Sequence, residues 1–361
     1  MKKIEPYRNR SQESMDREAQ EDLKAFFIEL IEEIDKKKIF FDEPFLSSFV
    51  EMGYLESTEA FFDQAEKHDS TLNFTDLFQA VRNVWIMNSL QLMFNQEIKM
   101  TPSVFSYSML YPYTDNFLDD PRISLSQKKK FNDRLLMVLE GTHLPDSSEG
   151  ESKIFDMIYN IEMQYNRLEY PNVYKSLLMI QDAQVQSLSQ NNPKKLSPNI
   201  LLPISFYKGG ASVLADGFLC KGDLTEDEMN FSFGYGAFLQ LMDDLQDIES
   251  DREDNHWTIF SVKHQEEIYD NEITKLLCYI EKVLDKYKLH SPKEESLKRI
   301  IKDCTRLMIM DVVGQNPNLV SQKLYKCLES HSKVRLSFFK EYHNKFSDWS
   351  SLLNQNTTSG E

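Results

Sequence analysis

The sequence has few of the residues that mark several common protein classes. Its four cysteines are widely spaced and form no CxxC pair, so we expect reduced core thiols and no disulfide framework. A membrane span needs about 18 consecutive apolar residues, and no run in the sequence approaches this length. The polar N-terminus also lacks the apolar segment of a signal peptide. We therefore expect a soluble, cytoplasmic protein without a transmembrane segment. The cysteines are Cys220, Cys278, Cys304 and Cys327.

Positive charge is also scarce, and several catalytic signatures are missing. The 41 basic residues against 58 acidic ones leave a net charge of -17, which argues against a nucleic-acid partner because phosphate backbones attract basic surfaces. The seven histidines form no HExxH motif or close pair, so a zinc site is not expected. Neither GxxxxGK[ST] nor GxGxxG occurs, so the chain has no recognisable cradle for nucleotide phosphates.

Apolar residues recur three and four positions apart along most of the chain, which indicates amphipathic helices. One stripe consists of Ile154, Ile158, Ile161, Tyr165 and Leu168, and a second of Ile273, Leu276, Leu277, Ile280 and Leu284. Capping-box pairs are Ser124 with Gln127, Thr225 with Glu228, and Ser291 with Glu294. Because no segment shows a convincing strand pattern, we predict an all-α fold.

The spacing of these helices predicts one antiparallel bundle over residues 21–350. Residues 1–20 and 351–361 are polar and aperiodic, which is typical of disordered ends. Residues 142–152 and 190–203 are rich in Ser, Asn, Pro and Gly, so we predict loops there.

The segment YPYTDNFLDDPRIS contains a first acidic cluster, formed by Asp115, Asp119 and Asp120. If residues 104–118 are helical, Asp115 and Asp119 lie four positions apart on one face. Like charges at this spacing destabilise a helix, so a bound cation is a natural reason to keep them together.

A second acidic cluster lies in FGYGAFLQLMDDLQDIESDRED. Asp243, Asp247 and Asp251 are spaced as a row along one helical face, and Asp244 lies beside them. Residues 231–242, just before the row, carry almost no charge, which predicts a buried helix. Acidic groups that enter a buried helix must be paired or bind a metal.

One such cluster means little in so acidic a chain, because a solvated helix end explains it as well. Two clusters, separated by enough chain for several antiparallel helices, favour a shared cation site. Carboxylates without His or Cys neighbours suit Mg²⁺, which commonly bridges to substrate phosphates. We therefore predict Mg²⁺ and a diphosphate ligand.

Lys208 lies in the mostly apolar segment SFYKGGASVLADGFL, beside Gly209 and Gly210. The two glycines would let a diphosphate approach the helix closely, and a buried lysine needs an anion. A surface lysine whose stem covers apolar neighbours would explain the same pattern.

Together these segments resemble the superfamily of trans-isoprenyl diphosphate synthases and class I terpene synthases, which includes squalene and phytoene synthases. DNFLDDPRIS looks like the first aspartate motif of the squalene synthase type, and GAFLQLMDDLQDIESD looks like the second, with Gln240 three residues before Asp243. The similarity covers roughly residues 105–260. It implies an isoprenoid synthase bundle with a central active-site cavity.

The resemblance also implies roles for individual residues. Catalysis would depend on Asp115, Asp119, Asp243 and Asp247. Three Mg²⁺ ions would bind with the diphosphate, through Asp115, Asp119, Asp120, Asp243, Asp244, Asp247 and Asp251. Lys208 and Gln240 would bind the diphosphate. Aromatic rings near the motifs would stabilise a carbocation, although core packing explains any single ring. These rings are Tyr111, Phe117, Phe233, Tyr235 and Phe238.

Several departures from the family patterns bear on the reaction. The chain elongators' N-terminal Gly-Lys-x-x-Arg pocket is missing, Gly209 replaces their threonine, and only Tyr207 represents the tyrosine-rich segment of the squalene type. We therefore expect cyclisation or elimination of a linear prenyl diphosphate by a terpene synthase. Head-to-head or head-to-tail prenyl transfer and a non-catalytic partner subunit of a prenyltransferase remain open alternatives. A homodimer is compatible with the resemblance.

Overall fold

The structure is a computed structural model. In it the chain forms two compact units, Met1–Gly53 and Tyr54–Glu361. The predicted disordered ends, 1–20 and 351–361, lie outside the described residues. The described residues are 29, 32–41, 44–69, 71–72, 74–119, 122–145, 148–191, 194, 196–264, 267–288, 292–341 and 343.

Every regular element of these residues is a helix, and no strand occurs among them, which confirms the all-α prediction. The first unit contains α3 (Phe45–Glu51). There the buried Asp35 carboxylate accepts hydrogen bonds from the backbone N–H of Ser47 at 2.7 Å and from its hydroxyl at 2.8 Å.

The second unit contains all the elements that carry the candidate site. The helices are α4 (Tyr54–His68), α5 (Phe74–Met93), α6 (Pro102–Asp119), α7 (Leu125–Leu139), α8 (Glu149–Gln164), α9 (Pro171–Ser187), η1 (Leu188–Gln190), α10 (Pro198–Lys221), α11 (Glu226–Gln246), α12 (Ile248–Glu253), α13 (Asp270–Lys286), α14 (Pro292–Gln315), η2 (Pro317–Leu319) and α15 (Gln322–Ser330). Of the helices in the described part, none combines the length and apolar character needed to cross a bilayer.

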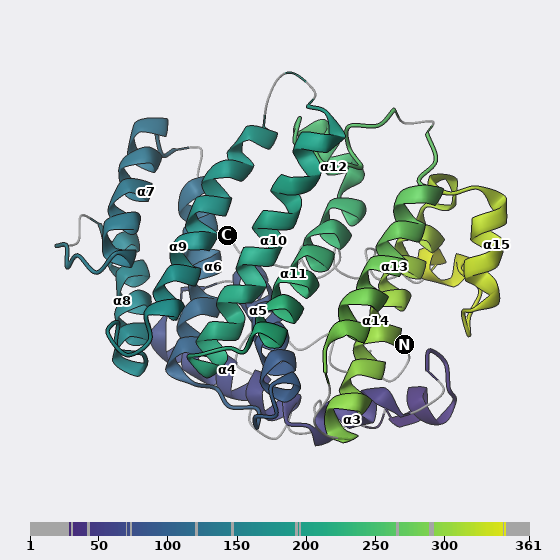
Figure 1. The fold of residues 1–361 in the computed structure, drawn as a ribbon, viewed down its shortest axis with the longest axis horizontal. Coiled ribbons are helices and arrows are strands. Elements are labelled where there is room, and N and C mark those ends of the chain that lie inside the picture. Colours follow the sequence, from purple (N-terminus) through teal and green to yellow (C-terminus); the bar gives the residue numbers. More distant parts are fainter. Residues whose placement is uncertain are drawn as a thin grey trace, which may run out of the picture. The chain divides into compact units, whose positions relative to one another are not determined.

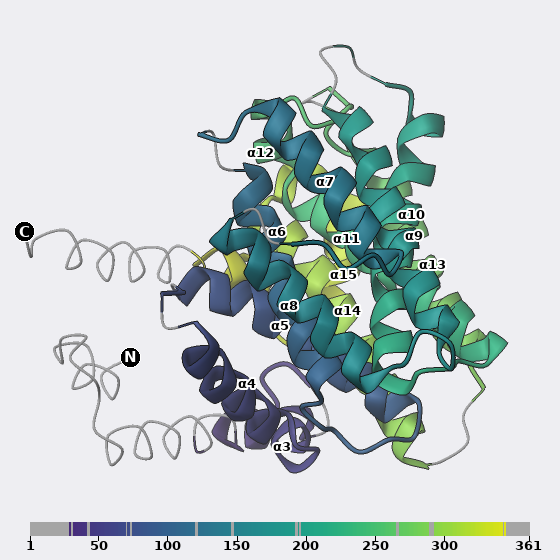
Figure 2. The same cartoon turned by 90° about the vertical axis from the view of Figure 1, so that its left-hand side faces the viewer.

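Two rows of helices build the second unit. In Figure 1, α9, α10, α11 and α13 lie side by side in this order, each in contact with the next. Behind them, contacts connect α8, α6, α5 and α14 in that order. Figure 2 shows the rows from the side, with α9 and α10 to the right of α5 and α6. Because α10 contacts both α6 and α11, one helix links the two that carry the acidic clusters.

The helix caps and stripes follow the sequence patterns closely. Capping boxes form at Ser124 and Thr225, as predicted. Each hydroxyl accepts a hydrogen bond from the backbone N–H three residues later, and the side chain of that later residue accepts one from the backbone N–H of the cap residue. Ser291, of the third predicted pair, lies outside the described residues. The stripe on α8 is buried as far as Tyr165, but Leu168 is 93% exposed beyond the helix end, so its inclusion in the predicted stripe was wrong.

Two predicted loops are shorter than expected. Helix α8 begins at Glu149, with Ser148 as its N-cap, inside the predicted loop 142–152. Helix α10 begins at Pro198 and continues through Pro203, inside the predicted loop 190–203. Proline suits the first helical position, and Pro203 removes only one backbone hydrogen bond near the exposed start of the helix.

Only one of the four free thiols is buried. Cys220 lies in the core on α10, but Cys278 and Cys327 are exposed, so the prediction of core thiols was wrong for those two. Cys278 lies off the buried stripe of α13, which explains its exposure.

Helices α10 and α11 cross at a pair of glycines. A Cβ added at Gly209 would overlap the carbonyl oxygen of Gly236, and one added at Gly236 would overlap that of Gly209. Only glycine allows the two backbones to approach this closely. The same register places Ser205 of α10 opposite Asp244 of α11, where their side chains form a hydrogen bond.

Candidate functional site

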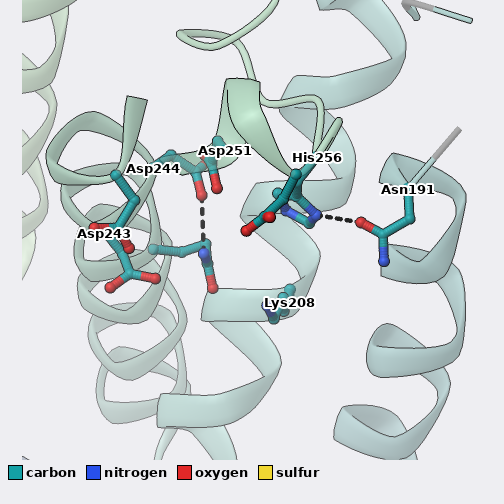
Figure 3. Close-up of a pocket in the computed structure, with 9 residues that line it drawn as sticks. Asn191, Lys208, Asp243, Asp244, Asp251 and His256 are labelled. Carbon is teal, nitrogen blue, oxygen red and sulfur yellow. Dashed lines mark hydrogen bonds between the residues drawn. The ribbon is translucent and has the colours of Figure 1, made fainter. Parts of the chain in front are cut away.

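An acidic cavity of about 400 Å³ lies where α11 ends and α12 begins (Figure 3). This volume falls within the range of small-molecule sites, roughly 300–1,000 Å³. The lining residues are Asn191, Lys208, Gln240, Asp243, Asp244, Asp247, Asp251, Asp254 and His256. The structure therefore brings the four aspartates of the second cluster together with Lys208 and Gln240.

The acidic row does not lie on one continuous helix. Helix α11 ends at Gln246, and Asp247 connects it to α12 with φ -97° and ψ 16°. The backbone N–H of Asp251 still bonds the carbonyl of Asp247 at 2.8 Å, so helical spacing is nearly kept across the break. Asp243 and Asp247 are exposed to solvent, Asp251 is partly exposed and Asp244 is buried.

The buried Asp244 carboxylate is held by two neutral donors. It accepts one hydrogen bond from Ser205 Oγ at 2.7 Å and one from Gln240 Nε2 at 2.9 Å. Burial raises the pKa of Asp244 to about 6 and Asp243 raises it too, whereas these hydrogen bonds and the charge of Lys208 lower it. Gln240, predicted as a diphosphate ligand, thus donates one of its two amide N–H groups to Asp244.

Asp247 and Asp251 of the cavity also have a raised pKa. Burial raises the pKa of Asp251 to about 7, and the charges of Asp244, Asp247 and Asp243 raise it as well. Burial and Asp243 raise the pKa of Asp247. The Oδ2 atom of Asp251 is buried without a hydrogen-bond partner in the described part of the chain. Crowded carboxylates with a free oxygen are an arrangement that a cation would stabilise.

Lys208 lies on α10, on the wall of the same cavity (Figure 3). Its charge influences Asp244 and His256, yet no carboxylate of the described residues lies within ion-pair distance of its ammonium group. The partly exposed ammonium group is therefore available to a ligand.

Asn191 and His256 also line this cavity, and neither was among the residues expected to bind the metal or the diphosphate. His256 Nδ1 lies 2.6 Å from Asn191 Oδ1, although 65 positions separate the two residues in the sequence. Burial lowers the pKa of His256, and so does the charge of Lys208. No sequence motif marks this pair, because only the fold brings residue 191 to the end of α12.

The first acidic cluster is only partly described. Asp115 and Asp119 lie near the C-terminal end of α6, which confirms the helix expected there. Their side chains, and Asp120 as a whole, lie outside the described residues. How they face the second cluster therefore stays a prediction.

Four of the predicted aromatic side chains are described, and they lie outside the acidic lining. Phe117 packs against Phe131 of α7 with ring centroids 4.4 Å apart, and Tyr235 stacks on Phe231 at 5.7 Å. Phe233 packs on Gly210, and Phe238 is fully buried. The side chain of Tyr111 is outside the described part. None of the four described rings lines the acidic cavity.

A smaller, mainly apolar cavity of about 90 Å³ lies among α6, α7, α8 and α9. Thr114, the residue just before Asp115, lines it, and Gln184 of α9 lines it as well. This cavity therefore lies beside the helix end that carries the first acidic cluster. Its other lining residues are Tyr107, Leu110, Leu135, Leu139, Ile158, Leu177, Ile180 and Gln181.

Among the described residues, no three His, Cys, Asp or Glu side chains converge closely enough to hold a metal ion by themselves. A cation at the acidic cavity would thus need further oxygen ligands. The chain matches no protein-family model, no curated protein and no solved structure.

Proposed function

We propose that this protein is an Mg²⁺-dependent enzyme that ionises a linear prenyl diphosphate and directs its cyclisation or elimination, as class I terpene synthases do. The observation that carries the proposal is the acidic cavity, where five aspartates line the same wall as a lysine that is free to bind an anion. A cation together with an anionic ligand would satisfy both sets of charges. A diphosphate with bound Mg²⁺ has this composition.

The carboxylates of the cavity fit Mg²⁺ better than a softer metal. Asp243 and Asp247 present exposed oxygens, and Asp251 has one buried oxygen without a partner in the described part. Mg²⁺ prefers oxygen ligands and is usually bound through one or two carboxylates plus substrate phosphates. Diphosphate oxygens would thus supply the ligands that these side chains do not. Bound there, Mg²⁺ would neutralise charge that develops on a diphosphate leaving group.

The chain's own residues would orient the diphosphate. The Lys208 ammonium group would form an ion pair with it, at a point where Gly209 lets α11 approach α10 closely. Asp244, fixed by Ser205 and Gln240, would place its negative charge behind the exposed row of carboxylates. Preorganised charges of this kind need little rearrangement during the reaction.

An isoprenoid synthase bundle with a central cavity is the fold type we propose. Its support is that α6 and α11, the two helices with acidic ends, both pack on α10. The apolar cavity beside Thr114 offers space for part of a hydrocarbon chain next to the first cluster. We propose that the side chains of Asp115 and Asp119 complete the metal site.

The test is incubation of the purified full chain with C10 to C25 prenyl diphosphates and Mg²⁺, each with and without isopentenyl diphosphate. Released diphosphate and extracted hydrocarbons are measured, and chelation by EDTA serves as control. We expect a hydrocarbon or alcohol from one substrate alone. A longer diphosphate or a head-to-head product would instead assign a prenyltransferase. No diphosphate release from any substrate would contradict the proposal and favour a non-catalytic partner subunit.

A further inference from the structure

Two segments far apart in the sequence are joined by a pair of hydrogen bonds at the edge of the acidic cavity. The backbone N–H of Trp257 donates to the carbonyl of Gln190 at 3.0 Å, and Gln190 Nε2 donates to the carbonyl of Trp257 at 3.1 Å. Both side chains are buried. The neighbouring residues, Asn191 and His256, are therefore held side by side by contacts other than their own.

The backbone of His256 is fixed on both sides. Its N–H donates to the carbonyl of Asp251 at 2.8 Å, and its carbonyl accepts a hydrogen bond from Ser261 Oγ at 2.7 Å. The imidazole then lies on the cavity wall with Nδ1 directed at Asn191, as the dashed line in Figure 3 shows. Because a carbonyl-type oxygen only accepts, Nδ1 carries the proton and donates to Asn191 Oδ1.

This hydrogen bond sets the orientation of the Asn191 amide. With Oδ1 turned to His256, the Nδ2 group is left to donate elsewhere. Gln240 Nε2 gives one of its two hydrogens to Asp244, and His256 donates its Nδ1 hydrogen to Asn191. Of the side chains that line the cavity, Lys208, Asn191 and Gln240 thus keep polar hydrogens for an anion.

We propose that Asn191 is a ligand of the substrate's diphosphate, and that His256 is a positioning residue that holds the Asn191 amide with its N–H groups toward that anion. The inference rests on the proposed function, and it adds a neutral donor to the charged Lys208. A neutral amide suits this wall because it can donate to phosphate oxygens without adding a positive charge that would form ion pairs with the surrounding aspartates.

The experiment is calorimetric titration of the full chain with inorganic pyrophosphate in excess Mg²⁺. We expect Asn191→Ala to weaken pyrophosphate binding by about tenfold, which is the loss of one good hydrogen bond to an anion. His256→Ala should weaken it by a smaller factor, about threefold, because the amide remains but loses its orientation. Asn172→Ala, on a partly exposed asparagine of α9 whose amide contacts Asp223, is the matched control and should bind as the unchanged protein does.

The double variant Asn191→Ala/His256→Ala separates positioning from independent binding. If His256 acts through Asn191, the double variant binds pyrophosphate no more weakly than Asn191→Ala alone. Fully additive losses would overturn the positioning role, and unchanged binding in folded Asn191→Ala would overturn the ligand role. Circular dichroism checks folding. If the unchanged protein does not bind pyrophosphate with Mg²⁺, the proposed function itself is contradicted. If the unchanged protein and the variants bind equally well, only the roles of Asn191 and His256 are contradicted.

Discussion

Asp216 on α10 and Asp244 on α11 are both buried carboxyl groups, but they differ in their partners and surroundings. Asp216 accepts one hydrogen bond, from Asn83 Nδ2 at 3.2 Å, and its Oδ2 has no partner in the described part of the chain. Asp244 accepts two hydrogen bonds and lines the acidic cavity. Burial raises the pKa of Asp216 to about 8, but that of Asp244 only to about 6.

The difference teaches that burial alone does not identify a functional acid. At neutral pH, Asp216 is mainly protonated and behaves as a polar core group between α10 and α5. Asp244 is mainly ionised, because donors and Lys208 offset part of its burial. A negative charge that is held in place beside a cavity can act on a ligand, whereas a neutral group in the core cannot attract a cation.

The largest expected effect tests whether function depends on the cavity carboxylates. We expect Asp243→Ala and Asp247→Ala each to lower kcat/KM by about 1,000-fold or more, about 4 kcal/mol of transition-state stabilisation. Both side chains are exposed, so circular dichroism should stay unchanged. Asp223→Ala, at an exposed aspartate between α10 and α11, should keep activity within about twofold, as expected for a surface substitution. Comparable losses of kcat/KM in all three variants would show that the cavity carboxylates have no special role in activity.

A smaller effect tests the close contact between α10 and α11, which places Ser205 next to Asp244. Gly236→Ala would place a Cβ against the Gly209 carbonyl and 2.8 Å from Val213 Cβ, so α10 and α11 must separate. We expect a loss of about 3 kcal/mol in the free energy of unfolding, measured by urea denaturation. The matched control is Gly150→Ala on α8, where an added Cβ meets no atom within 4 Å. Equal denaturation midpoints for the two variants would show that the glycine contact is not tight.

A pH series gives the smallest change per measured step and sharpens the comparison further. The pKa of Asp216 is raised by folding from 3.8 to about 8, so the folded state binds the extra proton and stability falls as the pH rises between these values. One such group changes the unfolding free energy by at most about 1.4 kcal/mol per pH unit. Asp216→Asn should remove this slope up to about pH 8, whereas Asp244→Asn should remove it only up to about pH 6.

Urea denaturation at pH 5, 6, 7 and 8 measures both slopes. The unchanged protein also carries the same-sign effect of Asp251, so the informative quantity is the difference between it and each variant. Curves that stay parallel from pH 6 to pH 8 for Asp216→Asn would show that Asp216 is ionised in the folded protein.

Local sequence patterns predicted much of the fold for physical reasons that act over a few residues. The Thr225 capping box and the buried stripe of α13 depend only on neighbours within a turn or two, so the sequence suffices. Leu168 shows the limit, because a leucine at the right spacing is exposed once its helix has ended. Pro203 shows another, since a proline is tolerated where the helix is near its start.

The candidate site was predictable only in part. The spacing of Asp243 and Asp247 and the lysine at 208 could be recognised in the sequence, and the structure gathers them in one cavity. The contact between Asn191 and His256 could not, because it depends on how the end of α9 meets the end of α12. The hydrogen bond from the Gln240 amide to Asp244 could not be predicted from the sequence either.

The short turn between α10 and α11 has a consequence for how the protein folds. Gly222, with φ +85°, ends α10, and the Thr225 box starts α11, so the two helices form a hairpin whose contacts are local in the sequence. Local contacts form fast because little chain entropy is lost in closing them. We therefore expect Lys208 and the aspartates of α11 to come together early in folding. Asn191, which depends on a distant pairing, would join them late.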